Sequence, residues 1–468
     1  MHVRSYHRFL IIASGFVFTL SLPWRVAAQG PAPTPIFSPA PVASAPAAAE
    51  QSGVHELTKA DLEAFLDALL PAQLASRDIA GAVVSVVKDG QVLLAKGYGY
   101  ADFAAKKPVV ADQTLFRPGS ISKVFTATAV MQLVEQGKLD LDRDVNDYLD
   151  FAIPKTFAEP ITLRRLLTHT AGFEESLKNL FVPSSKEMRP LRDYLIDAMP
   201  ERIFRPGTVP SYSNYGLTLA GYIVERTSGE PFDKYIATHI LMPLRMEHST
   251  FAQPLPPALE ASMSLGYLAA AHGAQGFEFG QAAPAGSLST TGADMTRLML
   301  AFLADGTLDG AAILKPETVR AMETRQFELH PAVRSLGFIF MEYSTNAQRV
   351  VGHAGDTIYF HSDMILMPAA RVGLFLSYNS AGSRSGGGRG EVIRAFLDRY
   401  FPDSAAAAPD VDPKMAQADG RAVAGVYITS RRSESTFFKI AAILGQFAVT
   451  SDNKGILTLE GNKNLRGG

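Results

Sequence analysis

The sequence contains no cysteine and only one tryptophan, and its charges nearly cancel. Without cysteine the chain has no disulfide bridge, thiolate metal site, cysteine nucleophile or acylated-cysteine lipoprotein anchor. With a formal net charge of −2 at pH 7, attraction of the whole chain to nucleic acid is not expected. The 468 residues have an ordinary apolar fraction of 47%, which excludes wholesale disorder. An enzyme or a binding protein remains, and composition does not separate these two classes.

The N-terminus has the pattern of an export signal. Arg4 and Arg8 precede the apolar run Phe9–Leu22, and the small residues Val26-Ala27-Ala28 follow it. The run is shorter than the roughly 20 apolar residues of a transmembrane helix, so no stable membrane span is expected. Residues 1–28 are therefore predicted to be a signal peptide, with an uncleaved anchor as the alternative. The protein is predicted to be periplasmic or secreted.

Composition divides the rest of the chain into four segments. Residues 29–52 are rich in Pro and Ala and are predicted to form a tether. Residues 53–401 are predicted to form the main domain, and residues 402–417 a linker. Residues 418–468 are predicted to form a small or incomplete β-rich module, in which the apolar run 437–449 is interpreted as a strand. Nothing in the sequence indicates a partner for this module.

The main domain combines helical and strand patterns. Apolar residues recur at helical spacing over residues 57–69, and two β-rich runs flank the hairpin signal Lys88-Asp89-Gly90. An amphipathic helix is predicted over residues 121–134, with Gly137 placed to end it. Strand character returns late, between residues 349 and 379. Strands at both ends with helices between them predict an α+β domain whose single sheet is assembled from distant segments.

Several common catalytic and metal-binding motifs are missing. Gly-x-Ser-x-Gly, the nucleophile motif of α/β-hydrolases, does not occur, and neither does the zinc motif His-Glu-x-x-His. No compact His/Asp/Glu cluster has zinc spacing. The acidic run Asp140–Asp144 lacks the glycine and closing glutamate of a calcium loop. We therefore expect neither a metal nor a cofactor.

The motif Ser-x-x-Lys occurs three times, and one copy has the context that its chemistry needs. Residues three apart on a helix lie on the same side, so the lysine amine can reach the serine hydroxyl and activate it. Ser85–Lys88 falls in a predicted strand, and Ser451–Lys454 falls in a predicted turn. Ser120–Lys123 opens a predicted helix directly after Pro118-Gly119. Ser120 is therefore the candidate nucleophile.

Two later motifs carry groups that suit acyl transfer. Tyr212-Ser213-Asn214 supplies a phenol that can relay protons and an amide that can hold both an acyl group and the lysine. His353-Ala354-Gly355 begins a predicted strand, and its small residues would let a substrate backbone lie along the strand edge. Each residue alone has an ordinary structural explanation. Together, and in this order, they indicate one site.

The three motifs resemble the signature boxes of penicillin-recognising serine hydrolases. The similarity covers about residues 54–401 and is greatest to the branch with class C β-lactamases, D-Ala-D-Ala carboxypeptidases, D-aminopeptidases and β-lactamase-like esterases. It implies a β-lactamase/transpeptidase-like α+β fold, in which helices flank an antiparallel sheet beside a mostly helical subdomain. The resemblance does not extend to the tether or to the C-terminal module.

The resemblance also implies a role for each matched residue. Ser120 would be the nucleophile that forms an acyl-enzyme, and Lys123 would help to take its proton. Tyr212 would be the general base of acylation and would then pass a proton to the leaving group. Asn214 would position the substrate and the lysine. The backbone N–H groups of Ser120 and Asp356 would form the oxyanion hole.

The third motif departs from the Lys-Thr-Gly of class C β-lactamases. His353, which the resemblance places among the catalytic groups, is mostly neutral at pH 7. Gly355 and Asp356 would contact the substrate, and the Asp356 carboxylate would further discourage an anionic substrate group. Some D-Ala-D-Ala peptidases and D-aminopeptidases of the family have His-x-Gly in this place, so the resemblance favours a peptidase acting on D- or non-standard residues. Cell-wall stems or linearised cyclic peptides such as microcystin are candidate substrates.

Other functions remain open at this point. Small esters are the second candidate substrates and β-lactams are the third, which would make the protein a carboxylesterase or a weak β-lactamase. An alternative of another class is a non-catalytic peptidoglycan- or penicillin-binding protein. The joint presence of Ser120, Lys123, Tyr212 and Asn214 disfavours that alternative.

Overall fold

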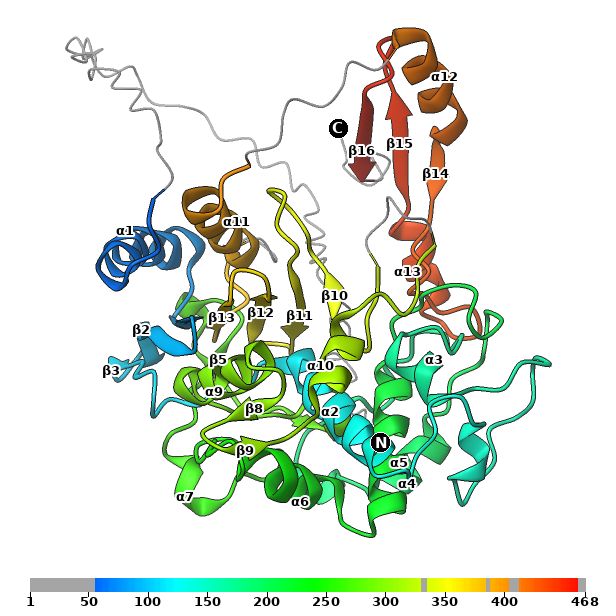
Figure 1. Ribbon diagram of the computed structural model, residues 1–468, viewed down its shortest axis with the longest axis horizontal. Helices are drawn as coiled ribbons and strands as arrows, with labels where there is room; N and C mark the ends of the chain where they lie inside the picture. The colour runs from blue at the N-terminus through cyan, green and yellow to red at the C-terminus, as the bar shows by residue number, and fades with distance from the viewer. Residues whose placement is uncertain (1–54, 330–334, 384–387, 404–411, 462–468) are drawn as a thin grey trace, which may run out of the picture.

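The computed structural model describes residues 55–329, 335–383, 388–403 and 412–461. The predicted signal peptide and the predicted tether, residues 1–28 and 29–52, lie outside this part of the chain. The main domain has the predicted α+β architecture, with one antiparallel sheet, helices on both of its faces and a large helical region beside it (Figure 1).

A seven-stranded antiparallel sheet forms the central layer, in the order β10-β11-β12-β13-β1-β2-β3. Its strands are β1 (Gly81–Lys88), β2 (Gln91–Asp102), β3 (Lys107–Pro108), β10 (Met341–Glu342), β11 (Val351–Asp356), β12 (His361–Met367) and β13 (Val372–Tyr378). The turn between β1 and β2 has positive φ at Asp89 and Gly90, as a tight Asp-Gly hairpin requires. Because β13 pairs with β1, the sheet joins distant segments, as the sequence predicts.

Four helices cover the two faces of the sheet: α1 (Lys59–Arg77) and α11 (Gly388–Tyr400) on one, and α2 (Ser122–Glu135) and α9 (Gly292–Leu303) on the other. Successive side chains of a strand point to opposite faces. In β1, Val84 therefore joins the core under α1 and α11, whereas Val83 joins the core under α2 and α9. This double burial explains why β1 is apolar along most of its length.

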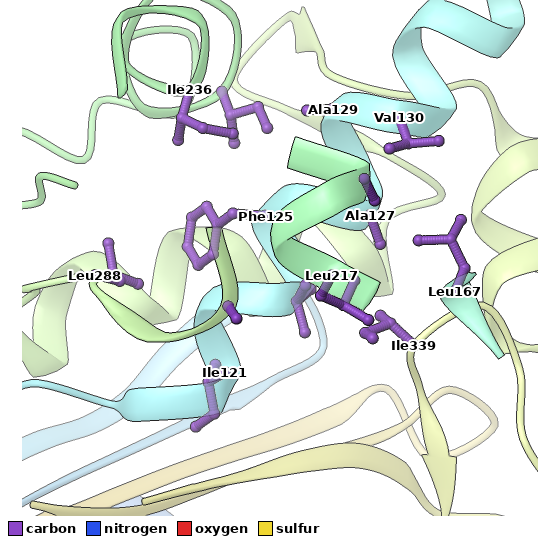
Figure 2. Packing of buried hydrophobic residues seen from close by; sticks show 14 of the residues in the cluster. Ile121, Phe125, Ala127, Ala129, Val130, Leu167, Leu217, Ile236, Leu288 and Ile339 are labelled. Atoms are coloured by element: carbon purple, nitrogen blue, oxygen red, sulfur yellow. The ribbon is translucent and has the colours of Figure 1, made fainter. Parts of the chain in front are cut away.

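Helix α2 is buried on all sides, although its sequence predicts an amphipathic helix. Every residue from Ser122 to Leu133 is buried. Helices α5 (Asn214–Ser228) and α8 (Ala283–Gly286) pack against α2, and Figure 2 shows the apolar side chains around it, Leu217 of α5 among them. The helical region thus encloses the polar side chains of α2, including that of Lys123.

The insertion between β3 and β10 is mostly helical. Its other helices are α3 (Leu163–Leu167), α4 (Leu191–Asp197), α6 (Phe232–Ile236), α7 (Pro257–Glu260) and α10 (Pro316–Glu323). Its short strands pair as β4 (Phe181–Val182) with β7 (Phe279–Gly280), β5 (Gly266–Tyr267) with β6 (Ala274–Gln275), and β8 (Thr307–Leu308) with β9 (Ala311–Ala312). Residues of the insertion surround the start of α2.

The C-terminal residues form a three-stranded antiparallel sheet with two helices (Figure 1). Its elements are α12 (Pro413–Val423), β14 (Gly425–Tyr427), α13 (Lys439–Leu444), β15 (Phe447–Ser451) and β16 (Leu457–Gly461). Helix α12 begins inside the predicted linker, because Asp412 caps it and Pro413 suits its first position. The strand predicted over residues 437–449 is wrong in its first half, where α13 contains the good helix formers Ala and Leu and Gly445 follows.

Candidate active site

The start of α2 brings Ser120 and Lys123 together. Ser120 lies in a single 3₁₀ turn, Gly119–Ile121, that continues into α2. The two side chains therefore point to the same side, and Lys123 Nζ lies 2.8 Å from Ser120 Oγ. Ser120 is partly exposed, whereas Lys123 is fully buried. The partly exposed Ser120 side chain is therefore in contact with the buried amine of Lys123.

Lys123 Nζ contacts three oxygen atoms. Besides Ser120 Oγ, it lies 2.9 Å from Asn214 Oδ1 and 2.6 Å from the carbonyl oxygen of Ala285 in α8. Burial lowers the pKa of Lys123 well below its usual value, and the charge of Arg431 lowers the pKa further. A neutral amine can donate hydrogen bonds to the amide and the carbonyl and still keep a lone pair that could face Ser120 Oγ. The three contacts are therefore compatible with Lys123 acting as a base toward Ser120.

Tyr212 stands beside this pair. Lys123 Nζ lies 4.8 Å from the centre of the Tyr212 ring, and the ring of buried His169 lies 4.2 Å from the same centre. Burial raises the pKa of Tyr212, while the charge of Arg431 and a side-chain hydrogen bond with Ser120 oppose that increase. The phenol therefore stays protonated until a neighbouring group or a reacting substrate draws its proton away.

The cap of α5 places Tyr212 and Asn214 at the same site. Ser213 is the N-cap residue, and its Oγ accepts a hydrogen bond from Gly216 N at 3.0 Å. The backbone N–H of Ser213 donates to Nδ1 of His169 at 3.2 Å. This anchored turn puts the residues on either side of Ser213 next to Lys123, and His169 helps to hold the turn in place.

Strand β11 brings the third motif to the edge of the cluster. His353 is 1% exposed, its Nδ1 faces the carbonyl oxygen of Ala354, and its ring lies 6.1 Å from that of Tyr212. Burial is the main cause that lowers the pKa of His353 to about 3, so the imidazole is neutral over the physiological pH range. The structure places His353 beside the proposed proton relay, and no direct hydrogen bond to Ser120 is found for it.

Gly355 packs directly against the 3₁₀ turn that carries Ser120. A Cβ atom at this position would lie 1.9 Å from the carbonyl oxygen of Pro118 and 2.8 Å from the backbone nitrogen of Ser120. Only glycine permits this approach, because backbone atoms on both sides cannot move away independently. The backbone of Asp356 follows beside Gly119. The two segments that carry the proposed oxyanion donors are thus in contact.

The charge of Asp356 is compensated, which corrects the repulsion expected from the sequence. Arg389 of α11 donates to both carboxylate oxygens of Asp356, one of them at 3.0 Å, and Nδ1 of His361 contacts the carboxylate as well. These partners hold the pKa of Asp356 far below its usual range against the effect of burial. The side chain is therefore an ionised group with its own cation, and its repulsion of a substrate anion is reduced.

Two further charged residues lie at the site, although no sequence motif marks them. The guanidinium carbon of Arg431 lies 4.6 Å from the centre of the Tyr212 ring. Its Nε donates a hydrogen bond to the carboxylate of Glu175. Arg431 belongs to the C-terminal module, so only the folded chain brings it to Tyr212.

Comparison with known proteins agrees with this geometry. The sequence matches the Beta-lactamase family over residues 66–398, which is most of the chain. The chain belongs to the Beta-lactamase family. This is a family of serine hydrolases, and the match ends before the C-terminal module that carries Arg431. The family assignment therefore covers the three motifs and leaves the contribution of the module to be argued from the structure.

Two proteins of similar sequence and one solved structure match this chain over different lengths. Protein flp of Staphylococcus aureus (strain MW2) is 32% identical over 196 residues, which are 41% of this chain and 39% of that protein. Beta-lactamase of Yersinia enterocolitica is 26% identical over 308 residues, 65% of this chain and 75% of that protein. The octameric penicillin-binding protein homologue from Pyrococcus abyssi has a TM-score of 0.63 at 24% identity, with 86% of this chain and 89% of that chain covered. The likeness to the Pyrococcus abyssi structure is one of fold. The match to protein flp spans about two fifths of the length of that protein.

Neither a metal centre nor a membrane span is found in the described residues. No group of three or more His, Cys, Asp or Glu side chains there is placed to hold a metal ion. No helix in the same part of the chain is long and apolar enough to cross a bilayer.

Proposed function

We propose that this protein hydrolyses amide and ester bonds through an acyl-enzyme on Ser120. The observation that carries the proposal is the 2.8 Å contact between Ser120 Oγ and the buried amine of Lys123, which has Tyr212 beside it. Ser120 Oγ attacks the substrate carbonyl as its proton passes to the Lys123–Tyr212 pair. Tyr212 then hands a proton to the leaving group, and water hydrolyses the acyl ester.

The proposed oxyanion hole consists of the backbone N–H groups of Ser120 and Asp356. The close approach of Gly355 to the Ser120 turn supports this assignment. Removal of one such donor typically raises the barrier by about 2.7–4 kcal/mol. Both donors are on backbone segments that the packing fixes before the substrate binds, so no reorganisation is needed during the reaction.

The proposed physiological substrates are peptides with D- or non-standard residues. Neutral His353 supports this class over β-lactams, since it supplies no fixed cation where class C β-lactamases have lysine. Carboxylesterase activity uses the same acyl-enzyme steps and is the second candidate. The predicted signal peptide adds the proposal that the protein acts outside the cytoplasm, on substrates such as cell-wall stems.

Substitution of the nucleophile tests the proposal. Purified wild type and Ser120→Ala are compared on 4-nitrophenyl acetate and on a D-residue peptide. We expect kcat/KM of the variant to fall by about 10³-fold or more, because the acyl-enzyme cannot form. Wild type should also acquire the mass of a fluorophosphonate label, and the variant should not. Equal inertness of both proteins, with no label on either, would instead support a binding protein.

A further inference from the structure

A loop of the C-terminal module docks against the active-site region. This docking loop, residues 430–435, lies between β14 and α13. The buried carboxylate of Glu174 accepts hydrogen bonds from the backbone nitrogens of Glu434 at 2.6 Å and Ser435 at 2.9 Å, and from both flanking serine hydroxyls. The backbone N–H of Glu175 donates to the carbonyl oxygen of Arg432 at 2.9 Å. The loop is therefore held by charged and backbone contacts to the segment just after Phe173.

A second set of contacts ties the docking loop to the tyrosine motif. Ser211 Oγ donates to the carbonyl oxygen of Ser430 at 3.2 Å, and Ser430 Oγ donates to the carbonyl oxygen of Pro210 at 2.5 Å. The next residue of the loop, Arg431, extends over the ring of Tyr212. Its position is thus fixed by its neighbours on both sides, and its guanidinium group reaches the catalytic tyrosine as part of the folded site.

The cationic side chains near the site differ in how many of their nitrogens already have hydrogen-bond partners. Lys123 is fully buried and has three oxygen contacts. Arg389 uses its terminal nitrogens on Asp356 and its Nε on Asp363, 3.1 Å away. Arg431 uses Nε on Glu175, and in the described part of the chain its two terminal nitrogens have no hydrogen-bond partner. The Arg431 side chain is 38% exposed, so those nitrogens are accessible.

The ion pair with Glu175 does not prevent Arg431 from binding another anion. A guanidinium group has five N–H donors, and its two terminal nitrogens bind a carboxylate in parallel. Arg389 of this protein demonstrates the arrangement, with one carboxylate on its terminal nitrogens and a second on Nε. In Arg431 the Nε position is already taken by Glu175. The two terminal nitrogens of Arg431 are therefore the part of its side chain that suits a substrate carboxylate.

We propose that Arg431 is a specificity residue that binds a carboxylate on the leaving group of the substrate. This inference rests on the proposed function, in which Tyr212 protonates the leaving group. Arg431 lies against the ring of Tyr212, the residue that protonates the leaving group in the proposed function, so we expect its free nitrogens to face the leaving group. The docking loop thereby brings a cation to the Tyr212 side of the site, which is a different position from that of His353 in the third motif.

Two matched esters test the inference. The anionic 3-carboxyphenyl acetate and the neutral 3-carbamoylphenyl acetate have leaving groups of similar shape and different charge, and their difference in intrinsic reactivity cancels when variants are compared. The measured quantity is the ratio of their kcat/KM values, anionic over neutral. In Arg431→Met we expect this ratio to fall about tenfold or more, as for a charged hydrogen bond. Arg431→Lys should give an intermediate ratio, because lysine retains the charge without the planar fork.

Arg432→Met is the matched control on the same loop. The Arg432 guanidinium lies over the ring of Phe204 and pairs with Glu434, so this variant should keep the wild-type ratio. If Arg431→Met lowers both esters by the same factor, its role is electrostatic or structural and the inference is overturned. If wild type hydrolyses neither ester faster than Ser120→Ala, the proposed function itself fails. The two failures are therefore distinguishable.

Discussion

At the scale of single residues, protonation states follow from burial. Lys123 is the clearest case, because a fully buried ammonium would have to leave water without a counter-ion in contact, and its three neighbours are an amide, a carbonyl and a hydroxyl. His353 is neutral for the same reason. Burial therefore favours the neutral amine of Lys123 at a lower pH than for an exposed lysine, and it keeps the imidazole of the third motif uncharged.

The pH dependence of activity tests the state of Lys123. Within the proposed Lys123–Tyr212 pair, burial keeps the Tyr212 phenol protonated and favours the neutral amine of Lys123. We therefore propose the amine as the first acceptor, and kcat/KM for 3-carbamoylphenyl acetate should rise with pH through the pKa of Lys123. Burial lowers that pKa, so the rise should lie well below pH 10.5, where an ordinary lysine titrates. Arg431 lowers the same pKa, so Arg431→Met should move the rise to higher pH. A wild-type rise near pH 10.5 would contradict the assignment of Lys123 as the base.

At the scale of secondary-structure elements, the site depends on the contact between β11 and the turn before α2. A strand residue with a Cβ atom cannot approach that turn closely enough, and Gly355 is the residue that permits the contact. The strand edge and the start of α2 each carry one proposed oxyanion donor. Their spacing is set by packing between the sheet and the helical region, which neither element determines alone.

Gly355→Ala tests this contact. The added methyl group would overlap the carbonyl oxygen of Pro118, so β11 and the Ser120 turn must separate. We expect kcat/KM to fall by about 10²-fold, the usual effect of moving a catalytic group by roughly 1 Å. Gly276→Ala is the control, since its Cβ would meet nothing within 4 Å, and its activity should match wild type. Unchanged activity of Gly355→Ala, with both melting temperatures measured, would show that the close approach is unimportant.

At the scale of the whole molecule, the candidate active site includes Arg431, which belongs to the predicted C-terminal module. Glu174 is the anchor, because its buried carboxylate accepts hydrogen bonds from successive residues of the docking loop. Such charge-assisted bonds are stronger than neutral ones. The main domain and the module are thus joined at a point next to Tyr212, and undocking of the loop would remove Arg431 from the site.

Glu174→Ala tests the anchor. Loss of its carboxylate leaves the amides of Glu434 and Ser435 without their acceptor, so their hydrogen exchange should accelerate by about tenfold or more. The ratio of anionic to neutral ester hydrolysis should fall as well, because Arg431 depends on the loop. Glu187→Ala, which removes an exposed carboxylate of the helical region, is the control for both readouts. Wild-type exchange in Glu174→Ala would mean that other contacts hold the loop.

Some sequence patterns failed because local information was insufficient. The residues of α13 are apolar enough for a strand, yet they include the good helix formers Ala and Leu and are followed by Gly445, and they form a helix. Helix α2 has an amphipathic pattern, yet packing on all sides buries its polar residues too. Periodicity reports which residues can be buried together, but it does not report how many layers surround an element.

The sequence by itself determined the parts of this protein that depend on short-range geometry. The Asp89-Gly90 hairpin, the helical spacing of Ser120 and Lys123, and the cap that places Tyr212 beside Asn214 all follow from neighbouring residues. Only the tertiary structure decided that Arg431 reaches the site. It also decided the protonation of the buried groups, because desolvation and the convergence of distant segments are properties of the packed chain and of no local stretch within it.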